Sequence, residues 1–316
     1  MLFLKRLLLP ISEFLGRILG EVSPPFFIVS DPFMNAVFQE NCIDGMKKLQ
    51  EESIDLTVTS PPYDNLRTYN DSSMWDFNVF KEVAEQLYRV TKPGGVIVWV
   101  VGDAVIKSSE TGSSFRQALH FMDLGFKLHD TMIYEKNGSS FPARAEGNRY
   151  SQIFEYMFVL SKGSKPKTAN LICDKENKWA GWTNWGKGTF RDKEGNLVER
   201  KQKPTPQFSP RNNIWKYNTG AGYTTKDKFA FEHPAMYPEA LAKDHILSWS
   251  NEGDLVLDPF MGAGTTAVCC IETNRNYVGF EIDEKYYNIC TRRIENRVTV
   301  MEPSTETTNP LLDALS

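Results

Sequence analysis

The sequence is poor in the residues that hold metals or form disulfides. Its 316 residues include four histidines and five cysteines, and neither set shows the paired spacing of a metal site. We therefore expect no metal. The odd cysteine count, without a disulfide pattern, indicates a reducing compartment, so we expect a cytoplasmic protein.

The sequence also lacks an apolar run long enough to span a bilayer. Residues 1–10 are rich in leucine, but Lys5 and Arg6 interrupt the run. The first regular strand is expected at 36–39, so residues 1–33 are predicted to be an extension outside the core. Residues 299–316 are polar and without periodicity, which predicts a disordered tail.

Charge of one sign is concentrated in one part of the chain. The net charge is −4, in a composition of 41% hydrophobic and 24% charged residues that is ordinary for a globular protein. Residues 175–228 nevertheless carry +7, which leaves −11 for the remainder. A basic segment on an acidic body suits a polyanionic partner, although a solvated lysine-rich loop has the same composition.

A short motif follows a predicted buried strand at 54–58. Its sequence is Thr59-Ser60-Pro61-Pro62-Tyr63, and the two prolines end the strand because neither can donate a backbone hydrogen bond. In an open α/β sheet, ligands bind at the carboxyl ends of strands. The motif offers acceptors for an amino group and an aromatic face for a planar ring.

A second motif lies near the end of the chain. Residues 253–266 read as a strand, a glycine-containing turn and the start of a helix, in the order Asp258-Pro259-Phe260-Met261-Gly262-Ala263-Gly264-Thr265. Glycines allow a ligand to approach the backbone closely, and a helix start presents unpaired N–H groups. The next strand, 277–283, carries Glu281, an acid suited to a ribose diol.

The two motifs together resemble those of the beta-group DNA amino-methyltransferases, which modify N4 of cytosine or N6 of adenine. The resemblance covers about residues 34–298 and includes the order of the motifs, with the cofactor loop roughly 200 residues after the catalytic motif. It implies an α/β fold with a single Rossmann-like, S-adenosylmethionine-dependent methyltransferase sheet that is circularly permuted. The implied domains are a catalytic half at 34–162, an inserted target-recognition region at 163–232 and a cofactor-binding half at 233–298.

Helices are expected at 41–49, 78–90, 115–124 and 238–250, and further strands at 96–101, 127–134 and 152–160. The loop at 64–76 follows the catalytic motif and is longer than most connections, which is typical of a mobile lid.

The resemblance also implies roles for individual residues. Ser60, Pro61, Pro62 and Tyr63 are the catalytic motif. S-adenosylmethionine is expected to contact Asp44, His233, Asp258, Pro259, Phe260, Gly262, Gly264, Thr265 and Glu281. Locally, Asp44 is equally well explained as a helix N-cap.

Tryptophans and basic residues alternate in the predicted recognition region. Trp179, Trp182, Trp185 and Trp215 occur there, and some of them are expected to be core residues. The alternative is a small accessory subdomain with the tryptophans as its core. The predicted DNA contacts are Lys187, Arg191, Lys201, Lys203 and Arg211, because cations bind phosphates and arginine can also read guanine edges.

In relatives, serine at position 60 most often accompanies N4-cytosine, and aspartate or asparagine there accompanies N6-adenine. We therefore expect a site-specific cytosine-N4 methyltransferase, with adenine-N6 as the alternative and an inactive DNA-binding regulator as a further one. No cysteine follows a proline, so the motif used for ring-carbon methylation is missing. Double-stranded DNA is the expected partner. A cognate restriction endonuclease, and a monomeric or homodimeric state, are left open.

Overall fold

The computed structural model describes residues 33–62, 75–138, 149–186, 188–199, 203–220, 222–233 and 236–301. The chain divides at Pro32/Phe33, and the second unit, Phe33–Ser316, contains every element described below. Tyr63, Lys187, Lys201 and most of the predicted lid lie outside the described residues.

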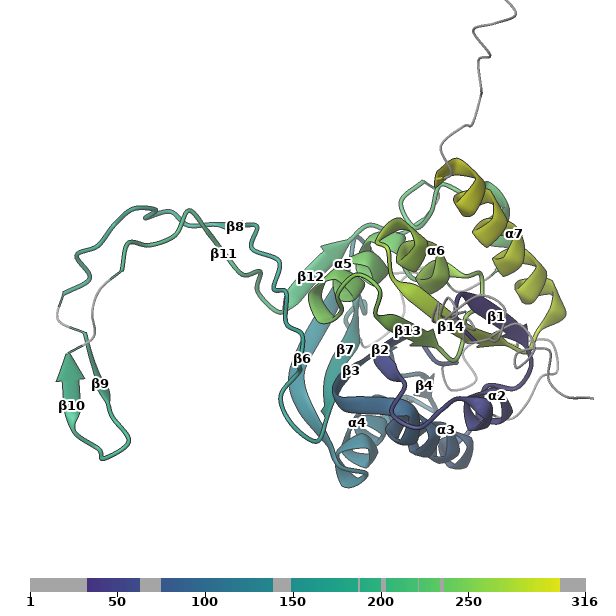
Figure 1. The fold of residues 1–316 in the computed structure, drawn as a ribbon, viewed down its shortest axis with the longest axis horizontal. Helices are drawn as coiled ribbons and strands as arrows, with labels where there is room; N and C mark the ends of the chain where they lie inside the picture. Colours follow the sequence, from purple (N-terminus) through teal and green to yellow (C-terminus); the bar gives the residue numbers. More distant parts are fainter. Residues whose placement is uncertain are drawn as a thin grey trace, which may run out of the picture. The chain divides into compact units, whose positions relative to one another are not determined.

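An eight-stranded sheet forms the centre of this unit (Figure 1). In spatial order, its strands are β1 (Ala36–Gln39), β14 (Asn276–Glu281), β13 (Leu255–Asp258), β2 (Ile54–Thr59), β3 (Thr91–Val101), β7 (Phe154–Lys162), β6 (Phe126–Lys136) and β12 (Ile214–Tyr217). The first five strands pair in parallel, and β7 is antiparallel to both of its neighbours. The predicted α/β methyltransferase sheet is therefore present.

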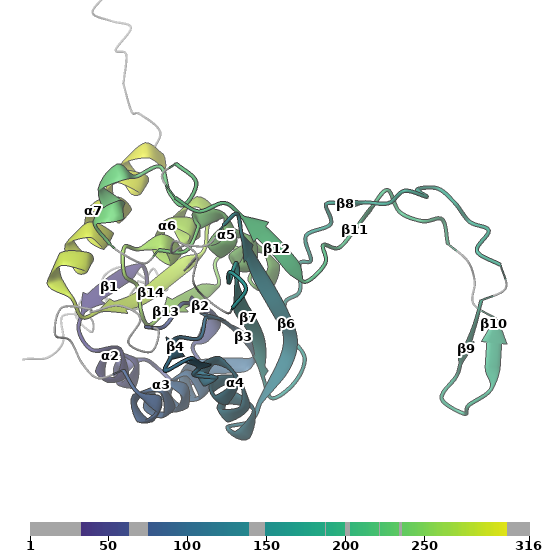
Figure 2. The same ribbon diagram turned by 180° about the vertical axis from the view of Figure 1, so that it is seen from behind.

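Helices cover both faces of the sheet (Figures 1 and 2). One face packs against α2 (Cys42–Lys48), α3 (Phe77–Val90) and α4 (Ser113–Asp123). The other packs against α5 (Glu239–Trp249), α6 (Thr265–Glu272) and α7 (Glu284–Met301). The central strands are buried on both faces, which explains why residues 96–101 are apolar without alternation.

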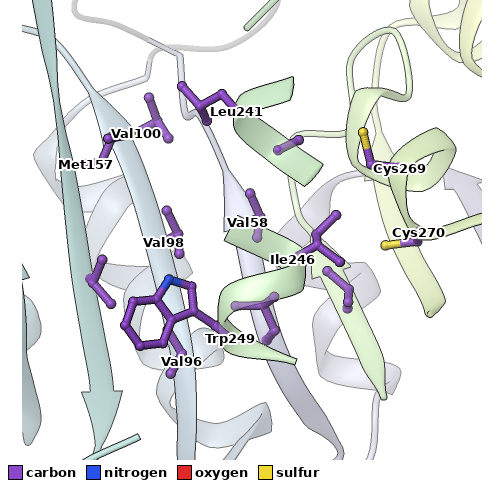
Figure 3. Close-up of a cluster of buried hydrophobic side chains, with 14 of the residues drawn as sticks. Val58, Val96, Val98, Val100, Met157, Leu241, Ile246, Trp249, Cys269 and Cys270 are labelled. Atoms are coloured by element: carbon purple, nitrogen blue, oxygen red, sulfur yellow. The ribbon is translucent and has the colours of Figure 1, made fainter. Parts of the chain in front are cut away.

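Figure 3 shows the core on the α5 and α6 face. Leu241, Ile246 and Trp249 of α5 lie against Val58 of β2 and Val98 of β3. All five side chains are buried, and together they fix α5 against the two central strands.

Most predicted elements occur with small shifts at their ends, but β3 begins at Thr91, five residues before the predicted strand at 96–101. Asp76 caps α3 by accepting hydrogen bonds from the backbone N–H groups of Asn78 and Val79, so the helix begins one residue earlier than expected. Pro238 is the N-cap of α5 and does not lie within that helix. At the chain end, α7 continues to Met301, so the tail predicted from residue 299 begins too early.

At the other end, Phe33 was assigned to the extension, but its ring contacts that of Phe38 in β1, with 5.3 Å between centroids. The boundary of the core therefore lies one residue earlier than predicted.

Short elements lie outside the large sheet. In the predicted recognition region, β8 (Lys175–Glu176) pairs with β11 (Phe208–Ser209) and β9 (Thr189–Arg191) pairs with β10 (Leu197–Glu199), both antiparallel. The short helix η1 (Lys228–Glu232) ends that region and contacts α7. A further small pair, β4 (Val105–Ile106) with β5 (Ser109–Glu110), precedes α4.

The boundary of the recognition region at residue 232 was wrong, because β12 is an edge strand of the methyltransferase sheet. Trp215 of β12 is 7% exposed, whereas Trp179, Trp182 and Trp185 are 55%, 48% and 58% exposed. The expectation that some tryptophans are core is confirmed for Trp215, which packs against the central sheet and not within a separate subdomain. Within the described residues, no helix has the length and apolar character needed to cross a membrane.

Candidate active site

The chain leaves the carboxyl ends of β2 and β13 in opposite directions. After β2, it passes to α3 on one face and returns as β3; after β13, it passes to α6 on the other face and returns as β14. β2 and β13 are parallel neighbours, and β3 and β14 flank them on opposite sides. Such a divergence opens a crevice at the strand ends, where ligands bind in open α/β sheets. Both sequence motifs lie at this point.

Ser60 and Pro61 follow β2 directly. Pro61 is buried, and Ser60 and Pro62 are both half-buried. The preceding residue, Thr59, is fully buried and donates a hydrogen bond to Oδ1 of Asp258 over 2.6 Å. The last residues of the two strands are therefore joined side chain to side chain.

Asp258 ends β13 and is 1% exposed. Its carboxylate accepts hydrogen bonds from the Thr59 and Thr266 hydroxyls, each at 2.6 Å, from the Phe260 backbone N–H at 3.0 Å and from the Tyr237 hydroxyl at 3.3 Å. Burial raises the pKa of Asp258, and these hydrogen bonds oppose that rise. The side chain predicted to touch the cofactor is engaged within the protein, where it shapes the loop that follows.

The turn between β13 and α6 depends on two glycines in the left-handed region. Gly262 has φ +52°, and a Cβ placed there would lie 3.0 Å from Nε2 of His233. Gly264 has φ +81°, and its Cβ would lie 2.7 Å from Sγ of Cys290. No other residue type fits either position without strain. The predicted residues His233, Gly262 and Gly264 are thus close together, with the His233 ring also packed on Tyr286 at 4.3 Å.

Glu281 ends β14 beside this turn. Its carboxylate accepts hydrogen bonds from the backbone N–H groups of Gly262 and Asp283, both at 2.8 Å. Burial raises the pKa of Glu281, and these two bonds lower it in part. The adjacent Ile282 is 48% exposed, an apolar side chain that the sequence analysis did not select. Strand position alone can find it, because it follows the acid at the same edge of the sheet.

The side chains present at this edge fit S-adenosylmethionine. The Glu281 carboxylate suits a ribose diol, while exposed Ile282 and half-buried Phe260 offer apolar surface for an adenine ring. The hydrogen bond from the Gly262 N–H holds the glycine turn next to the Glu281 carboxylate, so a ligand at the turn would lie beside that carboxylate. Pro259 is buried and shapes the turn.

Aromatic rings flank Phe260. Trp75 and Trp99 make edge contacts with it, at centroid distances of 5.2 and 6.2 Å. Trp75 belongs to the predicted lid, and its ring also contacts Phe80 of α3. The end of that lid is therefore packed against the wall of the site.

The structure excludes one of the two explanations for Asp44. The N-cap of α2 is Asn41, whose side chain accepts a hydrogen bond from the Ile43 N–H at 2.8 Å, so the N-cap explanation of Asp44 was wrong. Asp44 is exposed in the first turn and pairs with Lys47 at 3.0 Å. Gln39 lies opposite Glu281 in the register of β1 and β14, so Asn41 follows β1 at the edge where Glu281 lies. Its polarity and position make Asn41 a site candidate that the sequence analysis missed.

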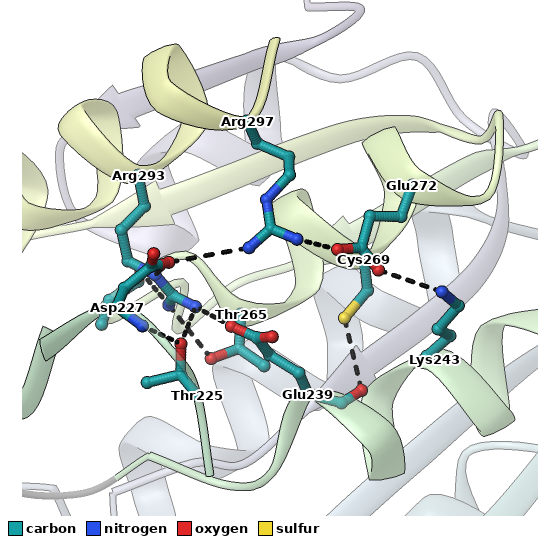
Figure 4. Close-up of polar contacts among 10 residues, drawn as sticks. Thr225, Asp227, Glu239, Lys243, Thr265, Cys269, Glu272, Arg293 and Arg297 are labelled. Atoms are coloured by element: carbon teal, nitrogen blue, oxygen red, sulfur yellow. Dashed lines mark hydrogen bonds and ion pairs between the residues drawn. The ribbon is translucent and has the colours of Figure 1, made fainter. Parts of the chain in front are cut away.

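Arg293 of α7 supports the turn between β13 and α6. Figure 4 shows its contacts with Asp227, Glu239 and Thr265. Arg293 is 1% exposed, and its guanidinium donates to the Ala263 carbonyl at 2.6 Å and to the Asp227 carboxylate at 3.0 Å. It also pairs with Glu239 at the start of α5. Thr265, a predicted cofactor contact, is 5% exposed and lies 3.5 Å from the same guanidinium. Nothing in the sequence distinguishes Arg293 from its neighbour Arg292, because the partners come from distant segments.

The predicted DNA contacts fall into different environments. Arg191 and Lys203 are exposed, although one guanidinium N–H of Arg191 donates to the Gly195 carbonyl at 2.8 Å. Arg211 is engaged by Asp174 and Asp244, each at 2.6 Å. Its guanidinium also lies over the Trp215 ring, 5.3 Å from the centroid. These contacts give Arg211 a structural role at the base of the region. Lys187 and Lys201 lie outside the described residues.

The cysteines of α6 lie behind the site. Cys269 and Cys270 are fully buried, and burial raises the pKa of Cys269 to about 12. A neutral buried thiol is a poor nucleophile. Within the described ranges, no group of three or more His, Cys, Asp or Glu side chains is arranged to hold a metal ion.

The sheet order, the glycine turn and the two strand-end motifs define a methyltransferase-type α/β domain. The profile of the family N6_N4_Mtase, described as DNA methylase, matches residues 54–292. The orphan methyltransferase M.BamHII of Bacillus amyloliquefaciens is 58% identical over 247 residues, which cover 78% of this chain and 90% of that protein. The type II methyltransferase M.HpaI of Haemophilus parainfluenzae is 29% identical, covering 81% and 73% of the two chains. The chain belongs to the N6/N4 DNA methylase family.

Solved structures share the fold. The PvuII DNA methyltransferase (cytosine-N4-specific) aligns with a TM-score of 0.61 and 19% identity, covering 84% of this chain and 90% of that chain. TTHA0409 of Thermus thermophilus, in complex with S-adenosyl-L-methionine, aligns with a TM-score of 0.56 and 19% identity, covering 83% and 93%. The fold prediction is confirmed.

Replacing Arg293 with methionine should destabilise the domain strongly. The substitution leaves the carboxylates of Asp227 and Glu239 without their buried partner, a loss of about 3–5 kcal/mol in the free energy of unfolding. Urea denaturation followed by circular dichroism measures it. The matched control is Arg292→Met, one residue earlier and exposed, which should change stability by less than about 1 kcal/mol. Equal losses in the two variants would contradict the structural role of Arg293.

Proposed function

We propose that this protein transfers a methyl group from S-adenosylmethionine to the N4 amine of cytosine in duplex DNA, at a specific sequence. One observation carries the proposal: Ser60 and Pro61 follow β2 directly beside the glycine turn of β13, with Thr59 hydrogen-bonded to Asp258. Acceptors for an amine and the features that fit the methyl donor therefore lie at the same crevice. Serine at position 60 favours cytosine over adenine.

The target amine is a poor nucleophile because its lone pair is delocalised into the ring. Ser60 Oγ and the Pro61 carbonyl can accept hydrogen bonds from its two hydrogens and draw the nitrogen toward tetrahedral geometry. Tyr63, outside the described residues, would stack on the base after it leaves the duplex. When bound, S-adenosylmethionine supplies an electrophilic methyl on a sulfonium.

The protein's contribution is then mainly placement and electrostatics. Ser60 is not a strong base, so the proton passes to solvent during or after transfer. Glu281, Ile282 and the Gly262 turn would hold the cofactor. The buried thiols Cys269 and Cys270 take no part, so no covalent enzyme intermediate forms.

Methylation of N6 of adenine is the second candidate, because the similar proteins include one named for cytosine and one named for adenine. One solved relative in fold is named cytosine-N4-specific, whereas YhdJ of Escherichia coli, 26% identical to this chain, is named a DNA adenine methyltransferase. The name of M.BamHII, an orphan methyltransferase, favours an enzyme that acts without a cognate endonuclease.

Expressing the protein in a methylation-deficient host and sequencing the host DNA by a modification-sensitive method identifies both the methylated base and the recognition sequence. Exclusive N6-methyladenine would replace the cytosine proposal, and a protein that binds S-adenosylmethionine without modifying DNA would favour an inactive regulator.

Ser60→Ala should lower kcat for DNA methylation about 100-fold or more, because one acceptor for the amine is removed. The dissociation constant for S-adenosylmethionine should stay within about twofold, because Ser60 is assigned to the base. Transfer of labelled methyl to DNA and titration calorimetry measure the two effects. Ser53→Ala is the control: its hydroxyl precedes β2 and donates to the Gln50 carbonyl, away from the strand's carboxyl end. A tenfold loss of cofactor affinity in folded Ser60→Ala would place Ser60 elsewhere.

Gly262→Ala should weaken S-adenosylmethionine binding by about tenfold. The new methyl group meets His233, and the positive φ adds strain of about 1–2 kcal/mol. Gly253→Ala separates the two causes, because Gly253 has φ +82° and open space around its Cβ position. That control should lose stability but keep its cofactor affinity. Calorimetry with both variants decides, and unchanged affinity in Gly262→Ala would remove the turn from the cofactor site.

The basic segment at 175–228 should bind DNA phosphates. Replacing Lys201 and Lys203 together with glutamine should weaken binding to every duplex and reduce the slope of log K against log salt by about one for each phosphate that is no longer neutralised. Lys127→Gln is the control. This exposed lysine is the second residue of β6, and the strand pairings align it with Leu56 of β2, toward the amino ends of the central strands and away from the proposed site. Fluorescence anisotropy over a range of salt concentrations measures the slopes. Equal slopes in all three proteins would exclude these lysines as phosphate ligands.

A further inference from the structure

A buried hydroxyl connects the two loops of the proposed active site where the sheet's own hydrogen bonding ends. The backbone pairing of β2 with β13 covers Leu56 with Val256 and Thr57 with Leu257. Beyond those pairs, the two strands lead into different loops. Thr59 Oγ1 then donates to Asp258 Oδ1 over 2.6 Å and joins the strands beyond the last pair, two residues further along β2 and one further along β13.

The other carboxylate oxygen is held from the opposite side. Asp258 Oδ2 accepts a hydrogen bond from the Thr266 hydroxyl at 2.6 Å and one from the Tyr237 hydroxyl at 3.3 Å. The Tyr237 and Thr266 hydroxyls are 2.6 Å apart, and Thr266 Oγ1 also lies 3.2 Å from the Val58 carbonyl. The carboxylate is therefore bonded to β2 on one side and to α6 and the residue before Pro238 on the other.

These hydrogen bonds fix the end of β2 relative to the end of β13. Thr59 immediately precedes Ser60, and Asp258 immediately precedes Pro259 and the glycine turn. Asp258 and Thr59 are 1% and 0% exposed, so solvent does not compete for the bond between them. A shift of either strand end would move one loop relative to the other. Displacements near 1 Å between reacting groups can lower rates by about 100-fold.

We propose that Thr59, together with Tyr237, is a positioning residue for methyl transfer: it fixes the loop that accepts the amine relative to the loop that holds the methyl donor, through the Asp258 carboxylate. Thr59 is fully buried, and the Tyr237 hydroxyl is directed to Asp258 and Thr266, so both act through the carboxylate. The proposal rests on the proposed function. Thr59 and Tyr237 thereby set the rate of transfer, whereas each loop binds its own ligand without them.

Substitutions on β2 allow a closely matched test. Thr59→Val keeps the shape of the side chain and removes the hydroxyl; Thr59→Ser keeps the hydroxyl. Thr57→Val is the control, because Thr57 is equally buried on the same strand and its hydroxyl makes no hydrogen bond among the described residues. Tyr237→Phe removes only the Tyr237 hydroxyl, and with it the contacts with Asp258 and Thr266; this variant serves if Thr59→Val does not fold.

The measurements are kcat and KM for methylation of duplex DNA, and the dissociation constant for S-adenosylmethionine from calorimetry. Thr59→Val should lower kcat about tenfold or more, while KM for DNA and the dissociation constant for S-adenosylmethionine stay within about twofold. Tyr237→Phe should also lower kcat. Thr59→Ser should keep kcat close to the wild-type value, and Thr57→Val should match the wild type.

Two kinds of result overturn the proposal. Equal kcat values for Thr59→Val and Thr57→Val would show that the hydroxyl does not position the loops. A loss of cofactor affinity that accounts for the whole loss of activity would assign Thr59 to the cofactor loop alone. Both results presuppose an active wild type, so they leave the proposed function intact. A wild-type protein that methylates neither cytosine nor adenine would overturn both proposals together.

Discussion

The buried carboxylate of Asp258 is the constraint on which the centre of this structure depends. Burying an ionisable group is unfavourable unless hydrogen bonds compensate, and here three hydroxyls and one backbone N–H do so. The donors come from β2, α6 and the turn after β13, and from the residue before Pro238. Satisfying one charge thus orders several segments that are up to about 200 residues apart in the chain.

A buried cation, Arg293, plays the corresponding part on the other side of the glycine turn between β13 and α6. Arg293 bonds to the carbonyl of Ala263 and to two carboxylates, Asp227 and Glu239. Its partners lie in the turn, in the segment before η1 and at the start of α5. The glycine turn is therefore held between an anion, Asp258, at its beginning and a cation behind it. A rigid support of this kind suits a loop whose ligand has to be placed accurately.

The basic segment at 175–228 has far less buried structure than the sheet domain. Its small strands pair with one another, and Trp179, Trp182 and Trp185 remain about half exposed. Exposed aromatic rings among lysines are unfavourable for a surface without a partner and suit contact with nucleic acid. Arg211 marks where this region joins the sheet domain, because its partners Asp174 and Asp244 lie on either side of that junction.

The sequence by itself determined seven of the eight strands of the central sheet, most of the helices and the two strand-end motifs. Buried strands such as 96–101 are continuous apolar runs, prolines end β2, and glycines mark the turn, so these signals are local. Only the tertiary structure decided what depends on distant partners. It placed Trp215 in the main sheet and turned Arg211 toward two aspartates. It also revealed Arg293 and the Thr59–Asp258 bond. The physical reason is the same in each of these cases: hydrogen bonds or ion pairs join residues that lie far apart in the sequence, and such a separation carries no periodic signal.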